Sequence, residues 1–249
     1  LCRQAADCGA EGIEIDPASI TAGQLADCGI ALSGGSTGGP LYDNWTDADA
    51  DKVVATAGGV KALGGEYVFF TAAPKGGWGA HEPVRPDDLK LAGERFNALA
   101  SRVAAEGGAL GLHNHAACPE GLAAELALVR DHVDPALVGL YLDIGWAFCS
   151  DGDPVAIIRE FGARCMEFHF RNHTADKVPS ETLNEGALDT PEIVDALNLG
   201  KLSVGPPYFN AVFAPLMVPV LLFMVIGSWA RWKNSFRGRP VSLSRGKPF

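Results

Sequence analysis

Short β-type runs alternate with amphipathic helical stretches along most of this chain, and this alternation constrains its fold more than any other feature. Six runs predict strands, at residues 12–15, 29–33, 67–71, 110–115, 138–145 and 165–170. Between the later runs, residues 88–106 and 120–132 carry apolar side chains at helical spacing, and Pro154 and Pro191 lie in the first turn of two further helices. Strands that alternate with such helices predict a parallel β/α architecture.

A closed barrel accounts for this pattern better than an open nucleotide-binding sheet. No GxGxxG motif follows the first strand, and the chain contains no GxxxxGK motif, so a dinucleotide fold and a nucleotide triphosphatase are both disfavoured. A (β/α)₈ barrel needs eight strands, and about six are visible. We therefore expect one strand before Leu1 and one after Leu199. The chain also lacks an initiator Met and begins within a helix, which indicates truncation at the N-terminus. The predicted fold is therefore α/β, an incomplete (β/α)₈ TIM barrel over residues 1–198.

Residues 199–249 differ abruptly from the barrel. Residues 211–230 form a run of 20 without a charge, which as a helix would be about 30 Å long and would match a bilayer. Trp229 and Trp232 lie where an interfacial aromatic belt belongs, and basic residues follow. We expect a single transmembrane helix with a basic tail, and association with the inner membrane if this tail is genuine. The alternative is a buried barrel helix with a strand.

Charge and cysteine content narrow the classes of function. Residues 1–200 carry 30 acidic and 13 basic side chains, whereas residues 201–249 carry seven basic and no acidic ones. The acidic part would repel phosphates, so we expect no nucleic-acid partner. The six cysteines form no CxxC pair and the N-terminus lacks the apolar core of a signal peptide. We therefore expect the barrel to be cytoplasmic.

Side chains that can bind a metal or move a proton gather near the carboxyl ends of the predicted strands, where barrel active sites form. In chain order they are Glu14, Asp16, His113, Asn114, His115, Glu120, Asp143, Trp146, Glu167, His169, Arg171 and His173. The two-residue period of a strand places His113 and His115 on one face.

Imidazoles and carboxylates that converge on one mouth suit a divalent metal ion such as Mn²⁺, Co²⁺, Zn²⁺ or Mg²⁺. Such an ion would polarise a carbonyl, and flanking groups would act as general acid and base. Each of these residues could instead have a structural role. A single His near a strand end could simply be hydrogen-bonded, and Asp143 could cap the following loop. Trp146 could belong to the core, and Arg171 could form an ion pair at the surface. Three successive β/α units that end in ligand-type residues favour the functional interpretation.

The motifs GIEI, LGLHNH, DPALVGLYLDIGWAF and EFHFRN, with the weaker NEGALDTPEIVDAL, cover residues 1–198 and resemble the xylose isomerase-like barrel superfamily. This group includes sugar phosphate isomerases/epimerases and inosose dehydratases. The resemblance implies four metal ligands, which follow the fifth to eighth strands as an acidic residue, an Asp, a His and a Glu. Carried over by motif, it implies that Glu120, Asp143 and His169 bind the metal and that His113, His115 and Arg171 occupy substrate-contacting positions. We predict that His113, His115 and Glu120 act in catalysis, and that Glu14, Trp146 and Arg171 contact the substrate.

The fourth ligand of that pattern has no counterpart, because no acidic residue occurs in residues 199–249. The segment GKLSVGPPYFN and the apolar run ending in WARWK instead resemble a fragment of the cytochrome c maturation haem lyase subunit (CcmF-like). We expect a domain boundary near residues 198–201, and we interpret this join as artificial. The chain as it stands should then have little or no turnover.

Three functions remain open on the sequence. The first is a metal-dependent sugar isomerase/epimerase that moves a proton next to a carbonyl of a small keto-sugar or polyol. The second is an inosose-type dehydratase that uses the same chemistry but expels water. The third is a non-enzymatic membrane fragment of cytochrome c biogenesis. The chain has no basic glycine-rich loop for a phosphate group, which favours a non-phosphorylated substrate.

Overall fold

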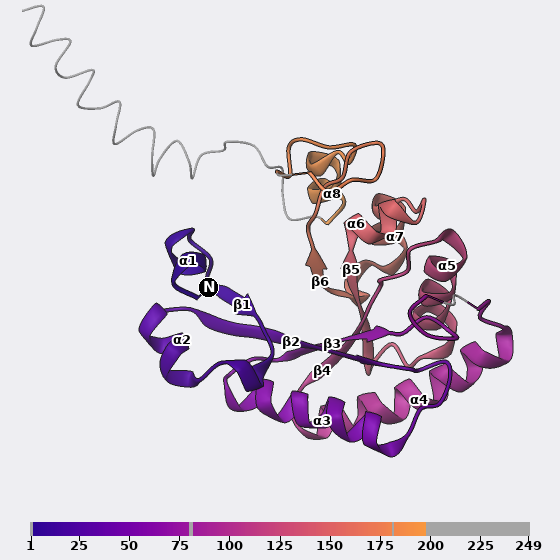
Figure 1. Cartoon of the computed structure of the whole chain (residues 1–249), viewed down its shortest axis with the longest axis horizontal. Helices are drawn as coiled ribbons and strands as arrows, with labels where there is room; N and C mark the ends of the chain where they lie inside the picture. The colour runs from indigo at the N-terminus through magenta and orange to yellow at the C-terminus, as the bar shows by residue number, and fades with distance from the viewer. Residues whose placement is uncertain (1, 80–81, 181, 198–249) are drawn as a thin grey trace, which may run out of the picture. The chain divides into compact units, whose positions relative to one another are not determined.

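The computed structural model describes residues 2–79, 82–180 and 182–197, which fold around one parallel sheet (Figure 1). The sheet has six strands in chain order, and each strand pairs in parallel with its sequence neighbours. The strands are β1 (Gly12–Glu14), β2 (Ala31–Gly39), β3 (Tyr67–Ala72), β4 (Ala109–His113), β5 (Val138–Asp143) and β6 (Cys165–His169). This is the arrangement of an incomplete (β/α)₈ barrel, which confirms the predicted α/β class for this part of the chain.

Helices connect the strands, and Figure 1 shows α3 and α4 side by side along one face of the sheet. The α-helices are α1 (Cys2–Asp7), α2 (Ala22–Cys28), α3 (Asp47–Ala62), α4 (Pro86–Ala105), α5 (Pro119–Ala127), α6 (Ile144–Cys149), α7 (Pro154–Phe161) and α8 (Thr190–Ala196). Two short 3₁₀ helices, η1 (Pro17–Ser19) and η3 (Gly162–Arg164), and a π-helical turn, η2 (Leu128–His132), complete the described elements.

The hydrophobic core lies between these helices and the sheet. The spacing of apolar residues along each helix determines which of its faces is buried there. In α4, Ala92, Phe96, Leu99 and Val103 are all buried, as their helical spacing predicts. The strands β3, β4 and β5 are buried on both faces, which explains their nearly continuous apolar sequences.

The predicted elements differ from the observed ones at several places. Helices α2, α3 and α6 were not predicted; a reciprocal capping box between Thr46 and Asp49 begins α3. Strand β4 ends at His113 rather than at residue 115. Strand β2 continues to Gly39, well past the predicted end at residue 33. Strand β5 ends at Asp143 rather than at residue 145, because the Asp143 side chain accepts a hydrogen bond from the Trp146 N–H and so begins α6.

The predicted membrane span at residues 211–230 lies outside the described residues. Within the ranges that the structure describes, no helix has the combination of length and apolar content that crossing a bilayer requires.

Candidate functional site

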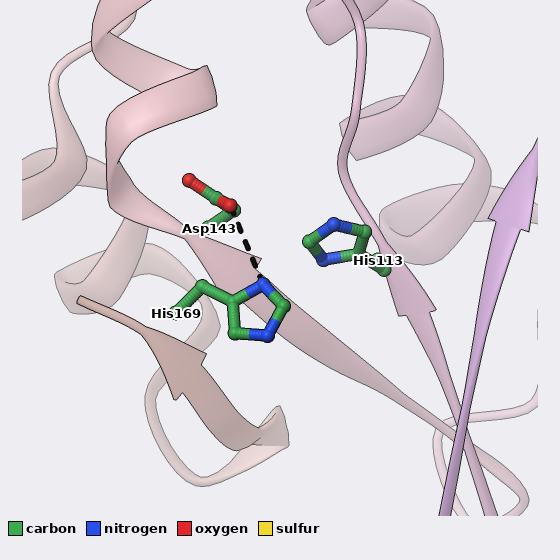
Figure 2. A group of neighbouring side chains, drawn as sticks. All are labelled: His113, Asp143 and His169. Atoms are coloured by element: carbon green, nitrogen blue, oxygen red, sulfur yellow. Dashed lines mark ion pairs between the residues drawn. The ribbon is translucent and has the colours of Figure 1, made fainter. Parts of the chain in front are cut away.

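Three potential metal ligands meet at the carboxyl ends of neighbouring strands. His113, Asp143 and His169 are the last residues of β4, β5 and β6. Each offers one ligand atom, and these atoms all lie within 4.8 Å of one another. Figure 2 shows Asp143 and His169 facing each other, with the His113 ring beside them. Parallel strands in sequential order bring these three side chains together.

Asp143 is fully buried, and its carboxylate is held from several sides. Oδ1 accepts the Trp146 N–H at 2.8 Å, while Oδ2 pairs with the Arg171 guanidinium and lies 3.4 Å from Nδ1 of His169. Burial by itself would raise the pKa of Asp143, but the hydrogen bonds from His169 and Arg171 hold that pKa below its ordinary value. The carboxylate is therefore charged at neutral pH and available to a cation.

His169 lies between two carboxylates. Its Nδ1 faces Asp143, and its Nε2 lies 3.1 Å from Oε2 of Glu14. Burial favours the neutral ring, but the hydrogen bonds to Asp143 and then to Glu14 outweigh it and raise the pKa of His169 to about 9. In the metal-free protein this imidazolium balances negative charge that a bound cation would otherwise balance.

His113 is buried, and its Nδ1 has no hydrogen-bond partner among the groups that the structure describes. Burial, followed by the nearby His169, lowers the pKa of His113 to about 4. The ring is therefore neutral at physiological pH and keeps an unshared lone pair, as a metal ligand requires. An orphaned buried nitrogen beside a charged carboxylate and a second imidazole fits a divalent cation.

A cavity of about 360 Å³ opens beside this group. Its lining residues are His113, His115, Trp146, His169, Phe170 and Arg171. The His115 and Trp146 rings are 4.5 Å apart between centroids, and the Arg171 guanidinium carbon lies 5.5 Å from the Trp146 ring centroid. The cavity therefore combines aromatic faces with hydrogen-bonding groups, which suits a small polar ligand.

Five of the predicted site residues line this cavity, whereas Glu120 and Glu14 lie elsewhere. Glu120 is exposed in the first turn of α5, which begins at Pro119, and it is not part of the ligand group. Glu14 contacts Tyr141 and His169 instead of the cavity. Asp16 is exposed and caps η1 through Ala18.

Sequence reasoning missed Glu125, a carboxyl that is 5% exposed. It accepts the backbone N–H groups of His115 and Ala116 at 3.1–3.2 Å and so fixes the turn that follows β4. Burial raises the pKa of Glu125 to about 8, although these two N–H groups act in the opposite direction. Its position between Leu122 and Leu126 on the buried face of α5 was the signal available in the sequence.

Comparison with known proteins finds the family model described as "Xylose isomerase-like TIM barrel", which matches residues 2–203. The Rhizopine catabolism protein MocC of Rhizobium meliloti is 26% identical over 155 residues, which cover 59% of this chain and 47% of MocC. A separate match, to the cytochrome c-type biogenesis protein CcmF of Pseudomonas fluorescens, is 53% identical over 45 residues, 18% of this chain and 7% of CcmF. The chain thus spans less than half the length of these relatives.

Two solved structures share the fold. A sugar phosphate isomerase/epimerase from Parabacteroides distasonis superposes with a TM-score of 0.60 at 18% identity, over 81% of this chain and 77% of that one. The probable 3-DHS dehydratase AsbF from Bacillus anthracis superposes with a TM-score of 0.63 at 14% identity, over 79% and 82% of the two chains. At these low sequence identities, the structural similarity shows only that the fold is shared.

Proposed function

Because this chain belongs to the xylose isomerase-like TIM barrel family, we propose that its barrel is built for metal-dependent isomerisation or epimerisation of a small keto-sugar or polyol. The observation that carries the proposal is the group formed by His113, Asp143 and His169 beside a cavity of about 360 Å³. A neutral imidazole, a charged carboxylate and a second imidazole are suitable ligands for Mn²⁺, Co²⁺, Zn²⁺ or Mg²⁺.

A divalent cation bound there would polarise a carbonyl oxygen and stabilise the negative charge that develops on it. The residues of the chain then have separate tasks. His115 lies in the cavity wall and is outside the ligand group, so it is our candidate for moving the proton next to that carbonyl. Burial lowers the pKa of His115, which keeps its ring neutral and able to accept a proton.

Trp146 and Arg171 are our candidates for binding the substrate. The Trp146 ring supplies an aromatic face in the cavity wall, and Arg171 supplies N–H donors for hydroxyl or carbonyl oxygens. We assign no role to Glu120, since it is exposed and outside the ligand group.

The second candidate, an inosose-type dehydratase, would use the same site for proton abstraction and then expel a hydroxyl group as water. Incubation with a panel of ketoses and inososes separates the two. A changed hydroxyl configuration or carbonyl position indicates an isomerase/epimerase, whereas loss of one water from the product indicates a dehydratase.

Metal occupancy tests the site directly. We expect the chain to retain Mn²⁺ or Co²⁺ after dialysis, and Asp143→Asn or His169→Ala to lower the retained metal, as measured by atomic emission. Asp153→Asn is a matched control, because Asp153 caps α7 and is not part of the ligand group. Unchanged metal occupancy in both site variants would refute the assignment of Asp143 and His169 as metal ligands. It would favour the third function, a non-enzymatic fragment of cytochrome c biogenesis.

We also propose that residues 1–198 and 199–249 are separate units, with the barrel in the cytoplasm. The CcmF match and the absence of acidic residues after residue 198 support this division, and the six free thiols suit a reducing compartment. A single sequencing read of the source DNA across the codons for residues 180–220 tests whether the two segments are continuous. We expect little turnover from this chain, because no acidic residue in residues 199–249 can supply the fourth ligand. Robust activity would contradict that requirement for a fourth ligand.

A further inference from the structure

Glu14 and His169 are at the carboxyl ends of β1 and β6, the two edge strands of the described sheet, yet their side chains meet. Oε2 of Glu14 lies 3.1 Å from Nε2 of His169 and accepts the Tyr141 hydroxyl at 2.6 Å. From this contact we infer that Glu14, held by Tyr141, is a positioning residue that orients the His169 ring. That Nδ1 of His169 binds a metal ion is taken from the proposed function.

The two nitrogens of His169 have different partners. Nδ1 lies 3.4 Å from Oδ2 of Asp143, and Nε2 faces Glu14. Because these nitrogens lie on different edges of the imidazole, Glu14 holds the ring from the edge that Asp143 does not contact. A carboxylate that accepts one N–H of a histidine fixes the ring and leaves the other nitrogen to the metal.

Tyr141 determines where the Glu14 carboxylate lies. Its ring stacks on Phe69 with 4.4 Å between centroids, so the hydroxyl has a fixed position. Tyr141 is two residues before Asp143 on β5, so one strand positions both groups that flank His169.

This geometry gives Glu14 a task different from substrate binding. Oε2 of Glu14 already has two protein partners, Tyr141 and His169, and Glu14 is not among the residues that line the cavity. It is also outside the group of ligand atoms that lie within 4.8 Å of one another. Glu14 therefore acts on the site through His169.

Two measurements on the full chain test the inference. The first is the ¹⁵N spectrum of the His169 ring in metal-free protein, in which we expect a protected Nε2 proton that Glu14→Ala loses. The second is Mn²⁺ affinity by calorimetry, which Glu14→Ala should weaken roughly 10- to 100-fold. Glu14→Gln keeps an acceptor oxygen and should restore part of both signals. Tyr141→Phe removes only the hydroxyl and should change both in the same direction by less.

Glu11→Gln is the matched control, since Glu11 is exposed just before β1 and should leave both signals unchanged. Unaltered ring signals and Mn²⁺ affinity in Glu14→Ala would overturn the inference, as would an equal loss in Glu11→Gln. If the wild-type chain takes up no Mn²⁺ but its His169 ring signal depends on Glu14, the positioning role stands and the proposed metal function fails. Glu14→Gln and Tyr141→Phe keep the test decisive if Glu14→Ala does not fold.

Discussion

The side-chain amide of Asn114 clamps the backbone of Asp143 through two hydrogen bonds. Oδ1 of Asn114 accepts the Asp143 N–H at 2.8 Å, and Nδ2 donates to the Asp143 carbonyl at 3.0 Å. Both residues are completely buried. The end of β4 is thereby fastened to the end of β5, at the residue that carries the central carboxylate of the site.

We predict that Asn114→Ala destabilises the fold and also weakens metal binding. Each buried backbone group that loses its partner costs about 1–3 kcal/mol, so urea denaturation should show a clear loss in the free energy of unfolding. Metal affinity should fall as well, because Asp143 is no longer held in register with His113.

Asn97 provides a matched control. Its amide also bridges two backbone groups, the His132 carbonyl and the Asp134 N–H, but it does so away from the ligand group. Asn97→Ala should therefore lower stability without lowering metal affinity. Equal metal affinities in Asn114→Ala and the wild type would refute the positioning role of Asn114.

Glu125 should make the stability of the fold depend on pH. Its pKa rises from 4.5 to about 8 on folding, so the folded state binds a proton that the unfolded state releases. This contribution is fully present below pH 4.5 and is lost as the pH rises through about 8. Over this interval we expect the free energy of unfolding to fall by up to about 1.4 kcal/mol per pH unit from this group.

Glu125→Gln isolates this effect, because the amide has nearly the same shape and does not ionise. Denaturation curves measured from pH 4.5 to pH 8 should give a flatter dependence for the variant than for the wild type. Parallel curves for the two proteins would show that Glu125 remains charged in the folded state.

Gly93 lies where α4 packs against η2. A Cβ atom at this position would collide with the backbone carbonyl and the side chain of His132, neither of which can move without shifting η2. We therefore expect Gly93→Ala to lower the free energy of unfolding by about 1–3 kcal/mol. A Cβ atom at Gly58, inside α3, would come no closer than 3.8 Å to a group elsewhere in the fold, the Glu106 carboxylate, so Gly58→Ala should instead stabilise by about 0.5–1 kcal/mol. A gain in stability from Gly93→Ala, measured in urea, would contradict this account of the packing.

The sequence predicts the part of the fold that local pattern determines. Every described strand was expected from its short β-type run, and the runs of β3, β4 and β5 are nearly continuously apolar because both faces of these strands are buried. The strand ends then predicted His113, Asp143 and His169 as neighbours, since a sequential parallel sheet aligns the carboxyl ends of its strands.

Contacts between distant segments could not be predicted in this way. Glu14 and His169 are 155 positions apart and lie at opposite edges of the sheet order, so no local period relates them. The exposure of Glu120 depends on where α5 begins, and helix boundaries are poorly determined by pattern alone. The reciprocal amide clamp on Asp143 likewise requires the three-dimensional register of β4 and β5.

Arg171 should compete with a metal ion for Asp143 and at the same time assist a sugar ligand. Its guanidinium pairs with Oδ2 of Asp143, the oxygen that also faces Nδ1 of His169. Removal of this positive charge lowers the repulsion of an incoming cation. We therefore expect Arg171→Gln to bind Mn²⁺ more tightly than the wild type and to bind ketoses more weakly, both measured by calorimetry.

Lys177→Gln is the control. It removes a positive charge from the same segment, where Lys177 pairs with the exposed Asp151, and it should change neither affinity. Weaker Mn²⁺ binding in Arg171→Gln would show that Arg171 holds Asp143 in its ligand geometry rather than competing for it.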